Sequence, residues 1–128
     1  MKGEFIMKEI CSFRSAERQD VPLILRYIRE LARYEKLEEE VVATEEILEE
    51  WLFDKEKAEV IFAVVEGKEV GFALFFHNFS TFLGRAGIYL EDLYVEPAHR
   101  GQGIGTALFR ELARIAVARG CGRLEWWC

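Results

Sequence analysis

The chain has 128 residues, of which 51% are hydrophobic and 31% are charged, and its formal net charge is −6. This length suits one domain with its own core, and the composition is that of a globular chain rather than a disordered one. The negative charge argues against nucleic-acid binding, because phosphate recognition needs a basic face. No apolar run approaches the roughly 18 residues of a membrane span, and the charged first residues are unlike a secretory signal. We therefore expect one cytoplasmic domain over residues 1–128.

Three cysteines, Cys11, Cys121 and Cys128, are scattered along the chain and form no C-x-x-C pair. An odd number of isolated thiols is typical of a reduced cytoplasmic protein, and it argues against a disulfide framework or a zinc site. We therefore expect no metal ion.

Charge is distributed unevenly along the chain. Residues 28–59 include 12 acidic and 5 basic residues, a net charge of −7, whereas residues 97–123 include five arginines and one acid, a net charge of +4. Two segments of opposite charge could hold an anionic cofactor and a cationic substrate. Charge alone favours the simpler alternative of two solvated helix faces.

The first half of the chain predicts one strand followed by two helices. Alternating residues predict a strand over 9–14, and Asp20 is placed to cap a helix that apolar spacing extends over 21–34. Thr44 is placed to cap a second helix, and the segment 35–40 between the helices is either loop or irregular helix. The apolar face of the second helix would comprise Ile47, Leu48, Trp51 and Leu52.

The second half changes to the period of strands, with one long helix near its end. The predicted elements are strands over 60–65, 70–76 and 88–95, a hairpin turn over 66–69, a loop with Gly84 and Gly87, a helix over 103–119 that ends at Gly120, and a strand over 123–127. The predicted order is therefore strand, two helices, three strands, helix and strand.

The most informative segment is the glycine-rich stretch over 95–106, which connects a predicted strand to the long helix. Glycine lets backbone amides approach a ligand closely, and a helix start adds unpaired N–H groups and the positive end of the helix dipole. Arg100 adds a positive charge at the rim. A tight turn that binds nothing is the alternative, but the strand before and the helix after both favour an anion site.

Two other glycine-rich loops do not fit this segment. A dinucleotide fingerprint needs a glycine three residues after Gly103, where Thr106 stands, and a P-loop needs a G-K-[ST] triplet that the chain lacks. What remains is R-x-x-G-x-G, formed by Arg100, Gly103 and Gly105. This pattern resembles the pyrophosphate-binding signature of the GNAT acetyltransferases.

The resemblance extends over most of the chain. The strand Tyr-Leu-Glu-Asp-Leu-Tyr-Val over 89–95, together with the glycine loop, is similar to the spermidine/spermine and thialysine N-acetyltransferases of the GNAT superfamily. Residues 28–35 and 44–46 are similar to the first helical region of the same enzymes. The resemblance implies an α/β (α+β) fold with a mixed sheet that opens after its fourth strand.

The resemblance also implies acetyl-CoA as co-substrate, with its pantetheine arm in the opening of the sheet. Backbone groups on the fourth strand would pair with that arm, and amides of the glycine loop would hold the pyrophosphate. The implied cofactor contacts are Leu93, Tyr94, Val95, Arg100, Gly101, Gln102, Gly103, Ile104, Gly105 and Thr106. Glu91 would bind the amine or remove its proton, which makes it the implied catalytic residue. The implied substrate contacts are Tyr34, Glu35, Glu91, Asp92, Glu125, Trp126 and Trp127.

The residues themselves support the acidic part of this site. Glu91 and Asp92 interrupt an apolar strand, and neighbours on a strand point to opposite faces, so at least one carboxylate should approach a covered surface. A buried charge needs a partner, because leaving it unpaired costs several kcal/mol. An ion pair with an internal arginine is the alternative to a ligand. Tyr34 could equally be a core residue and Glu35 a solvated one, and tryptophans such as Trp126 and Trp127 are more often core residues than ligand contacts.

The family continues beyond the matched segment to a tyrosine that acts as general acid, and no residue of this chain corresponds to it. We therefore expect the domain to be cut short after the start of its fifth strand. The exposed strand edge and apolar surface would then favour a homodimer or a larger assembly that associates through the C-terminal strand. Acetyl-CoA binding is better supported by the sequence than catalysis.

The expected reaction is direct acetyl transfer from acetyl-CoA to a primary amine of a small cationic molecule, a polyamine, diamine or thialysine-like compound. The amine must lose a proton before it attacks, because amine pKa values lie near ~10. The backbone N–H of Leu93 is a candidate for stabilising the oxyanion that develops. Two alternatives remain: another amine acceptor (an amino acid, antibiotic or protein N-terminus), or a weakly active acyl-CoA-binding module.

Overall fold

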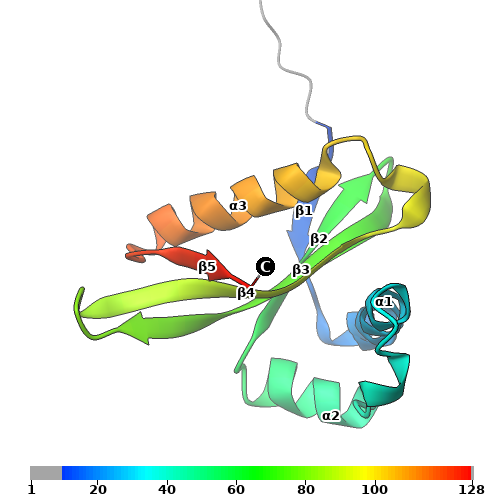
Figure 1. The fold of residues 1–128 in the computed structure, drawn as a ribbon, viewed down its shortest axis with the longest axis horizontal. Helices are drawn as coiled ribbons and strands as arrows, with labels where there is room; N and C mark the ends of the chain where they lie inside the picture. Colours follow the sequence, from blue (N-terminus) through cyan, green and yellow to red (C-terminus); the bar gives the residue numbers. More distant parts are fainter. Residues whose placement is uncertain (1–9, 128) are drawn as a thin grey trace, which may run out of the picture.

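The computed structural model describes residues 10–127, which form one sheet with helices on both faces (Figure 1). The strands are β1 (Ser12–Ser15), β2 (Glu59–Val65), β3 (Lys68–Ser80), β4 (Arg85–Val95) and β5 (Leu124–Trp126). The helices are α1 (Val21–Tyr34), α2 (Glu45–Glu49), which continues into a π-helical turn over Glu50–Asp54, and α3 (Ile104–Ala118). Short 3-10 turns cover Arg18–Asp20, Glu38–Glu40 and Pro97–His99. The predicted order of strands and helices is confirmed.

The strands follow chain order across the sheet, β1-β2-β3-β4-β5. The first four are antiparallel neighbours, whereas β5 lies parallel to β4. A parallel neighbour needs a crossover connection, and α3 provides it between β4 and β5. The mixed sheet that the resemblance implied is therefore confirmed.

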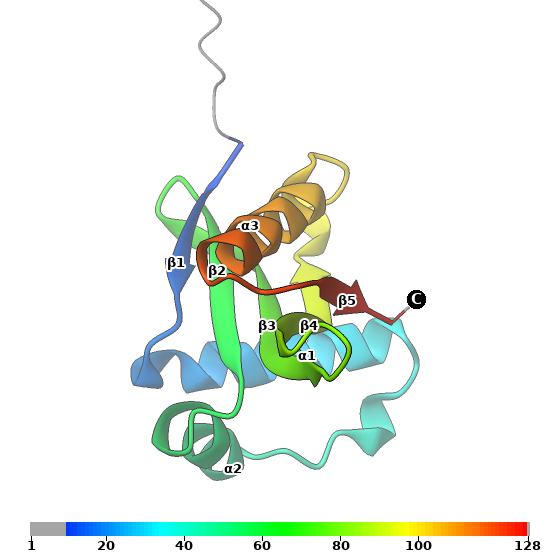
Figure 2. The same ribbon diagram turned by 90° about the vertical axis from the view of Figure 1, so that its left-hand side faces the viewer.

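The sheet separates two apolar cores. On one face α3 packs through Ile104, Leu108 and Leu112, which are almost completely buried. On the other face α1 packs through Ile24 and Tyr27, which are also completely buried. Figure 2 shows α3 and the α1–α2 layer on opposite sides of the strands. Because strand side chains alternate between faces, the near-continuous apolar runs of β2 and β3 fill both cores.

The strand β4 carries a β-bulge where it pairs with β3. Asp92 is paired with Leu74 of β3, but Leu90 is paired with the next residue, Phe75, so Glu91 is an extra residue without a partner. A bulge of this kind bends a strand and changes the direction of the side chains that follow it.

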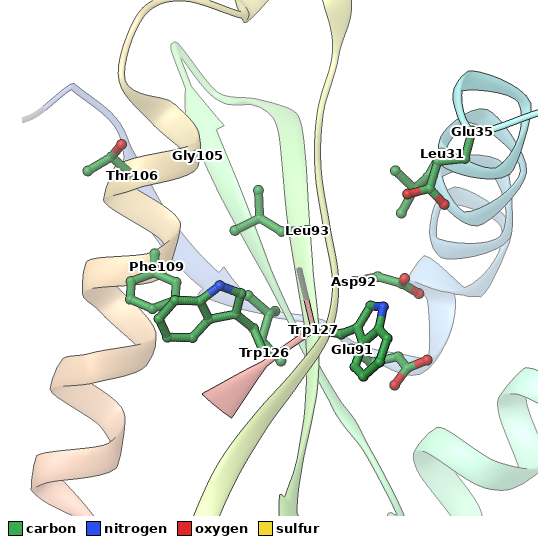
Figure 3. A pocket seen from close by; sticks show the side chains of 11 residues that line it. Leu31, Glu35, Glu91, Asp92, Leu93, Gly105, Thr106, Phe109, Trp126 and Trp127 are labelled. Atoms are coloured by element: carbon green, nitrogen blue, oxygen red, sulfur yellow. The ribbon is translucent and has the colours of Figure 1, made fainter. Parts of the chain in front are cut away.

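The bulge places two adjacent carboxylates on the same side of the sheet. Leu90 and Leu93 both pack against the core on the α3 face, although three positions separate them. Glu91 and Asp92 therefore both lie toward the α1 face, as Figure 3 shows. The expectation that these neighbours point to opposite faces is wrong, because it assumed a regular strand.

Two strands extend further than the sequence pattern predicts. β3 continues to Ser80 and β4 begins at Arg85, so Gly87 lies within a strand rather than in a loop. A Cβ atom at Gly87 would lie 2.7 Å from Asn78 Oδ1 and 3.0 Å from the carbonyl oxygen of Arg123. Glycine is thus needed where β4 passes closely between its neighbours. The predicted first strand forms as β1, and Glu9 lies outside the described residues.

Asp20 stands before α1 as predicted, but its side chain does not cap that helix. The carboxylate accepts a hydrogen bond from the backbone N–H of Glu17 at 2.7 Å and two from the guanidinium of Arg14 at 2.8 Å. These bonds, with the Arg14 bonds first, lower the pKa of Asp20 although burial opposes the shift. The side chain therefore ties β1 to the start of α1.

Thr44 caps α2 as predicted, since its Oγ1 accepts a hydrogen bond from the N–H of Ile47 at 3.2 Å. The predicted apolar face is only partly buried: Leu52 is 8% exposed, but Ile47 and Trp51 are 45% and 46% exposed. The helix changes to a π-helical turn at Glu50. The wider turn rotates the later residues, so a face drawn at α-helical spacing does not stay aligned.

Candidate active site

A pocket of about 490 Å³ lies along β4, between α1 on one side and α3 on the other (Figure 3). We call it the central pocket. Most of its lining was predicted to contact substrate or cofactor from the sequence. The lining residues are Leu31, Glu35, Leu90, Glu91, Asp92, Leu93, Gly105, Thr106, Phe109, Trp126 and Trp127.

The α1 side of the central pocket is acidic. Glu91 and Asp92 come from the bulge of β4, and Glu35 comes from the residue that follows α1. None of the ion pairs formed by residues 10–127 includes any of these three carboxylates. Within the described residues, the alternative of a salt bridge between these carboxylates and an internal arginine is therefore wrong.

Asp92 has the most perturbed carboxylate of the pocket. Its partial burial raises its pKa to about 6, and the nearby negative charges of Glu91 and Glu35 add to the shift. A carboxylate with a pKa near neutrality can accept a proton at pH 7 and release it again readily.

The α3 side of the central pocket is apolar and aromatic. The rings of Phe109 and Trp126 meet edge to face, with centroids 4.7 Å apart and planes at 84°. Leu93 lies above this pair, nearer to the start of α3, where Gly105 and Thr106 complete the wall (Figure 3). The bulged strand therefore separates an acidic half of the pocket from an apolar half.

The glycine-rich loop has the geometry of an anion site. Gly101 and Gly103 adopt positive φ angles of 78° and 85°, a backbone conformation that favours glycine. Gly103 is the N-cap of α3 and offers no side chain to cap the helix. The first N–H groups of α3 are therefore open to a ligand such as a pyrophosphate. Gly105 and Thr106 connect this helix start to the central pocket.

Arg100 belongs to the loop by its backbone, but its side chain turns toward α1. Its Nε donates a hydrogen bond to the carbonyl oxygen of Val95 at 2.9 Å. The guanidinium lies 4.8 Å from the ring centroid of Tyr34 and 5.4 Å from that of Tyr94. Both Arg100 and Tyr34 line a neighbouring hollow rather than the central pocket. Tyr34, which was predicted as a substrate contact, is exposed and does not line the central pocket, although the next residue, Glu35, does.

Tyr94 also has its side chain on the α1 face, where a network holds α1 to β4. Its hydroxyl donates a hydrogen bond to Glu30 at 2.7 Å, and burial, then that carboxylate, raises the pKa of Tyr94 to about 12. The hydroxyl of Tyr27 donates similarly to Glu96 at 2.6 Å. Sequence reasoning missed this network, because its members are 64 and 69 positions apart.

One edge of β4 is available beside the loop. Pairing with β5 covers Ile88–Leu90 of β4 and reaches its last pair at Leu90 and Trp126. Within the described residues, the segment from Glu91 to Val95 pairs with β3 alone. This segment includes the three residues predicted to contact the pantetheine arm by their backbone. The further opening of the sheet stays a prediction, because the described part of β5 ends at that last pair.

Glu125 is not brought to the central pocket. Its carboxylate accepts a hydrogen bond from Asn78 Nδ2 at 2.7 Å and forms an ion pair with Arg123 at 3.0 Å. Alternation along β5 directs Trp126 into the pocket and Glu125 away from it. Trp127 also lines the pocket, on the side of Glu91 (Figure 3).

Three lining residues were missed from the sequence: Leu31, Leu90 and Phe109. Leu90 precedes the recognised Glu-Asp pair, and Phe109 lies one helical turn after Gly105. Spacing on α3 could have identified Phe109, since residues four apart share a helix face. Leu31 comes from a helix that only the tertiary structure brings across from β4.

Residues 10–127 include neither a candidate metal cluster nor a candidate membrane span. No group of three or more histidine, cysteine, aspartate or glutamate side chains is arranged to hold a metal ion. None of the helices in this part of the chain combines the length and apolarity that crossing a membrane requires.

Comparison with known proteins places this geometry in one family. The model of the acetyltransferase (GNAT) family matches residues 24–128. The chain is 42% identical over 121 residues to the thialysine N-epsilon-acetyltransferase of Bos taurus, covering 88% of this chain and 71% of that protein. It is 33% identical over 121 residues to the human spermidine/spermine N(1)-acetyltransferase-like protein 1, covering 88% of this chain and 17% of that protein.

A solved structure agrees with these relatives. The ribosomal-protein-alanine N-acetyltransferase of Brucella melitensis is 25% identical and superposes with a TM-score of 0.75, over 91% of this chain and 78% of that one. The glycine loop before α3, the bulged β4 and the mixed sheet therefore occur together in a chain whose relatives are N-acetyltransferases. This chain belongs to the acetyltransferase (GNAT) family.

Proposed function

We propose that this chain transfers the acetyl group of acetyl-CoA to a primary amine of a small polycation, a polyamine, diamine or thialysine-like molecule. One observation carries the proposal. Three carboxylates, Glu35, Glu91 and Asp92, line one half of the central pocket, and no lysine or arginine lines it among the described residues. A cationic acceptor fits an acidic wall, because each carboxylate can take a charge-assisted hydrogen bond from an ammonium group.

The donor side of the site rests on the loop before α3. Backbone amides at Gly103–Thr106 would hold the pyrophosphate, which the uncapped start of α3 supports. The pantetheine arm would pair with the edge of β4 that β5 leaves free. The apolar half of the pocket continues from this loop toward Trp126. Donor and acceptor would therefore approach β4 from opposite faces and meet at the bulge.

Asp92 and Glu91 would have different roles toward the amine acceptor. The pKa of Asp92, raised to about 6 by burial and neighbouring acids, supports it as the group that accepts the ammonium proton. Glu91, exposed at the bulge, would hold the cationic substrate beside it. The sequence assigned both roles to Glu91, and the burial of Asp92 favours the division.

The reaction removes two protons from the attacking nitrogen and exchanges the C–S bond of the thioester for a C–N bond. Bound acetyl-CoA supplies an activated thioester carbonyl. Asp92 takes the proton of the attacking ammonium, which must be removed because amine pKa values lie near ~10. The amine nitrogen then forms the C–N bond while the C–S bond breaks. The nitrogen loses its second proton to solvent, and coenzyme A leaves as a thiolate that takes up a proton from solvent.

We propose that the protein acts as a homodimer. Phe79 lies near the end of β3 and is 62% exposed, and Phe82 and Leu83 in the turn before β4 are 100% and 53% exposed. Clustered exposed apolar side chains are typical of interfaces. Sedimentation across a concentration series tests this, and Phe82→Ser should shift the distribution toward monomer. A monomer at all concentrations would contradict the assembly and leave the catalytic proposal standing.

An acceptor panel tests the proposed reaction. Spermidine, putrescine, thialysine, a free α-amino acid and a peptide N-terminus would be supplied with acetyl-CoA, and product followed by mass spectrometry. We expect kcat/KM to be highest for the acceptors with two or more cationic groups. Equal use of the free α-amino acid or of the peptide N-terminus would contradict the acidic-wall argument, and acetyl-CoA binding without transfer to any amine would favour an acyl-CoA-binding module.

A further inference from the structure

The apolar half of the central pocket ends at an aromatic corner. Phe109 of α3 and Trp126 of β5 meet edge to face at 4.7 Å, a favourable arrangement for two aromatic rings. Leu93 and Thr106 lie on the loop side of this corner (Figure 3). The wall is thus open toward the glycine loop and closed toward β5.

The corner coincides with the end of the free edge of β4. From Val95 back to Leu90 the strand spans about 16 Å at roughly 3.3 Å per residue. At Leu90 the edge becomes occupied, because this residue is paired with Trp126 of β5. An extended donor that starts at the loop and follows the edge therefore meets Trp126 and Phe109 at its far end.

The fold fixes the backbone of both residues, although the side chain of Trp126 is 50% exposed. Trp126 is a paired residue of β5, and Phe109 is one position from Leu108, which is completely buried in the core under α3. The opposite half of the pocket offers no alternative space, because Glu35, Glu91 and Asp92 line it and an alkyl chain there would desolvate their carboxylates.

We propose that Phe109 and Trp126 limit the length of the acyl group, so that the enzyme uses acetyl-CoA and discriminates against longer acyl thioesters. This inference rests on the proposed function and specifies its donor. The pair acts as a steric stop: extra methylene groups would have to displace two packed rings, and overpacking of this kind is unfavourable.

The test compares acetyl-CoA, butyryl-CoA and hexanoyl-CoA in the parent and in Phe109→Leu, Phe109→Ala and Phe109→Trp. Kd is measured by calorimetry without acceptor, and kcat/KM with the best acceptor. Val117→Ala is the matched control, since Val117 lies on the same helix but is 81% exposed and outside the pocket. Thermal melting of each variant shows whether the fold is retained.

We expect the parent to prefer acetyl-CoA over butyryl-CoA by about tenfold or more, the scale on which a pocket discriminates one or two methylene groups. Phe109→Ala should reduce this preference by about tenfold in both Kd and kcat/KM, Phe109→Leu by less, and Phe109→Trp should sharpen it. Val117→Ala should leave it unchanged.

Three results would overturn the inference: an unchanged butyryl-to-acetyl ratio in folded Phe109→Ala, an equal loss of affinity for all three thioesters, or a parent without acyl preference. If Phe109→Ala does not fold, Phe109→Leu and Trp126→Leu decide in its place. A parent that binds no acyl-CoA at all would instead refute the proposed function, so the two failures are distinguishable.

Discussion

The guanidinium of Arg100 lies 4.8 Å from the ring centroid of Tyr34, so the loop before α3 is in contact with the last residue of α1. The next residue, Glu35, lines the acidic half of the central pocket. This contact therefore connects the loop proposed for the donor with the wall proposed for the acceptor.

Removal of the Tyr34 ring should loosen that connection. We expect Tyr34→Leu to raise KM for the amine and Kd for acetyl-CoA each by about two- to tenfold, the range of one cation–π contact. Tyr34→Phe keeps the ring and should behave like the parent. A double-mutant cycle with Arg100→Met measures the coupling, and fully additive effects would show that Tyr34 acts independently of Arg100.

Substitutions at Gly105 test ligand binding with less effect on folding than substitutions at Gly103. A Cβ atom at Gly105 would meet Leu93 at 3.5 Å, an ordinary contact, whereas Gly103 has a φ of 85° that disfavours any side chain. Gly105→Asp should abolish the rise in melting temperature that CoA produces, because it puts a negative charge beside the pyrophosphate. Gly105→Ala should retain a large part of that rise. A folded Gly105→Asp with parental CoA affinity would refute the loop assignment.

The proposed role of Asp92 as general base predicts how kcat/KM depends on pH. The carboxylate must be ionised to accept a proton, and its pKa is raised to about 6. We expect kcat/KM to fall as the pH decreases through about 6, and Asp92→Asn to lower kcat by about 10²-fold or more and remove this limb. Steady-state rates from pH 5 to pH 9 measure both. A parental profile in Asp92→Asn would exclude Asp92 as the base.

The same pKa shift predicts that Asp92 destabilises the fold at neutral pH. The pKa of Asp92 in the folded protein lies above its unfolded value of about 3.9. Below about pH 3.9 the carboxyl is neutral in both states and does not reduce the stability of the fold. As the pH rises through about 6 the buried group ionises, and stability is lost. Asp92→Asn should therefore raise the free energy of unfolding at pH 7.5 by up to about 3 kcal/mol, since one pKa unit corresponds to about 1.4 kcal/mol. Urea titrations at pH 4 and pH 7.5 test this, and an equal gain at both values would contradict it.

Glu91 and Glu125 provide a matched pair for the acceptor wall. Glu91 lines the central pocket, whereas Glu125 is bound to Asn78 and Arg123 outside it. We expect Glu91→Gln to lower kcat/KM for a polyamine by about tenfold, the scale of a hydrogen bond to a charged group, with CoA affinity unchanged. Glu125→Gln should leave both quantities near the parental values. The reverse pattern would place the acceptor beside Glu125 instead of Glu91.

The glycine loop and the helix after it could be predicted because their information is local. Positive φ angles at Gly101 and Gly103, an uncapped helix start and the left-handed Gly120 at the end of α3 depend on residue types at fixed spacings. The acidic pair at 91–92 was equally visible, as an interruption of an apolar strand. By itself, the sequence determined the order of elements, the family and the candidate residues.

The tertiary structure decided where those candidates point. Whether Glu91 and Asp92 share a face depends on a bulge, which is a matter of register against β3 and leaves no local mark. Pairing of β5 with β4 decided that Trp126 enters the pocket while Glu125 turns to Asn78. Side-chain direction on a strand changes with a shift of a single residue, so it is set by long-range pairing rather than by local pattern.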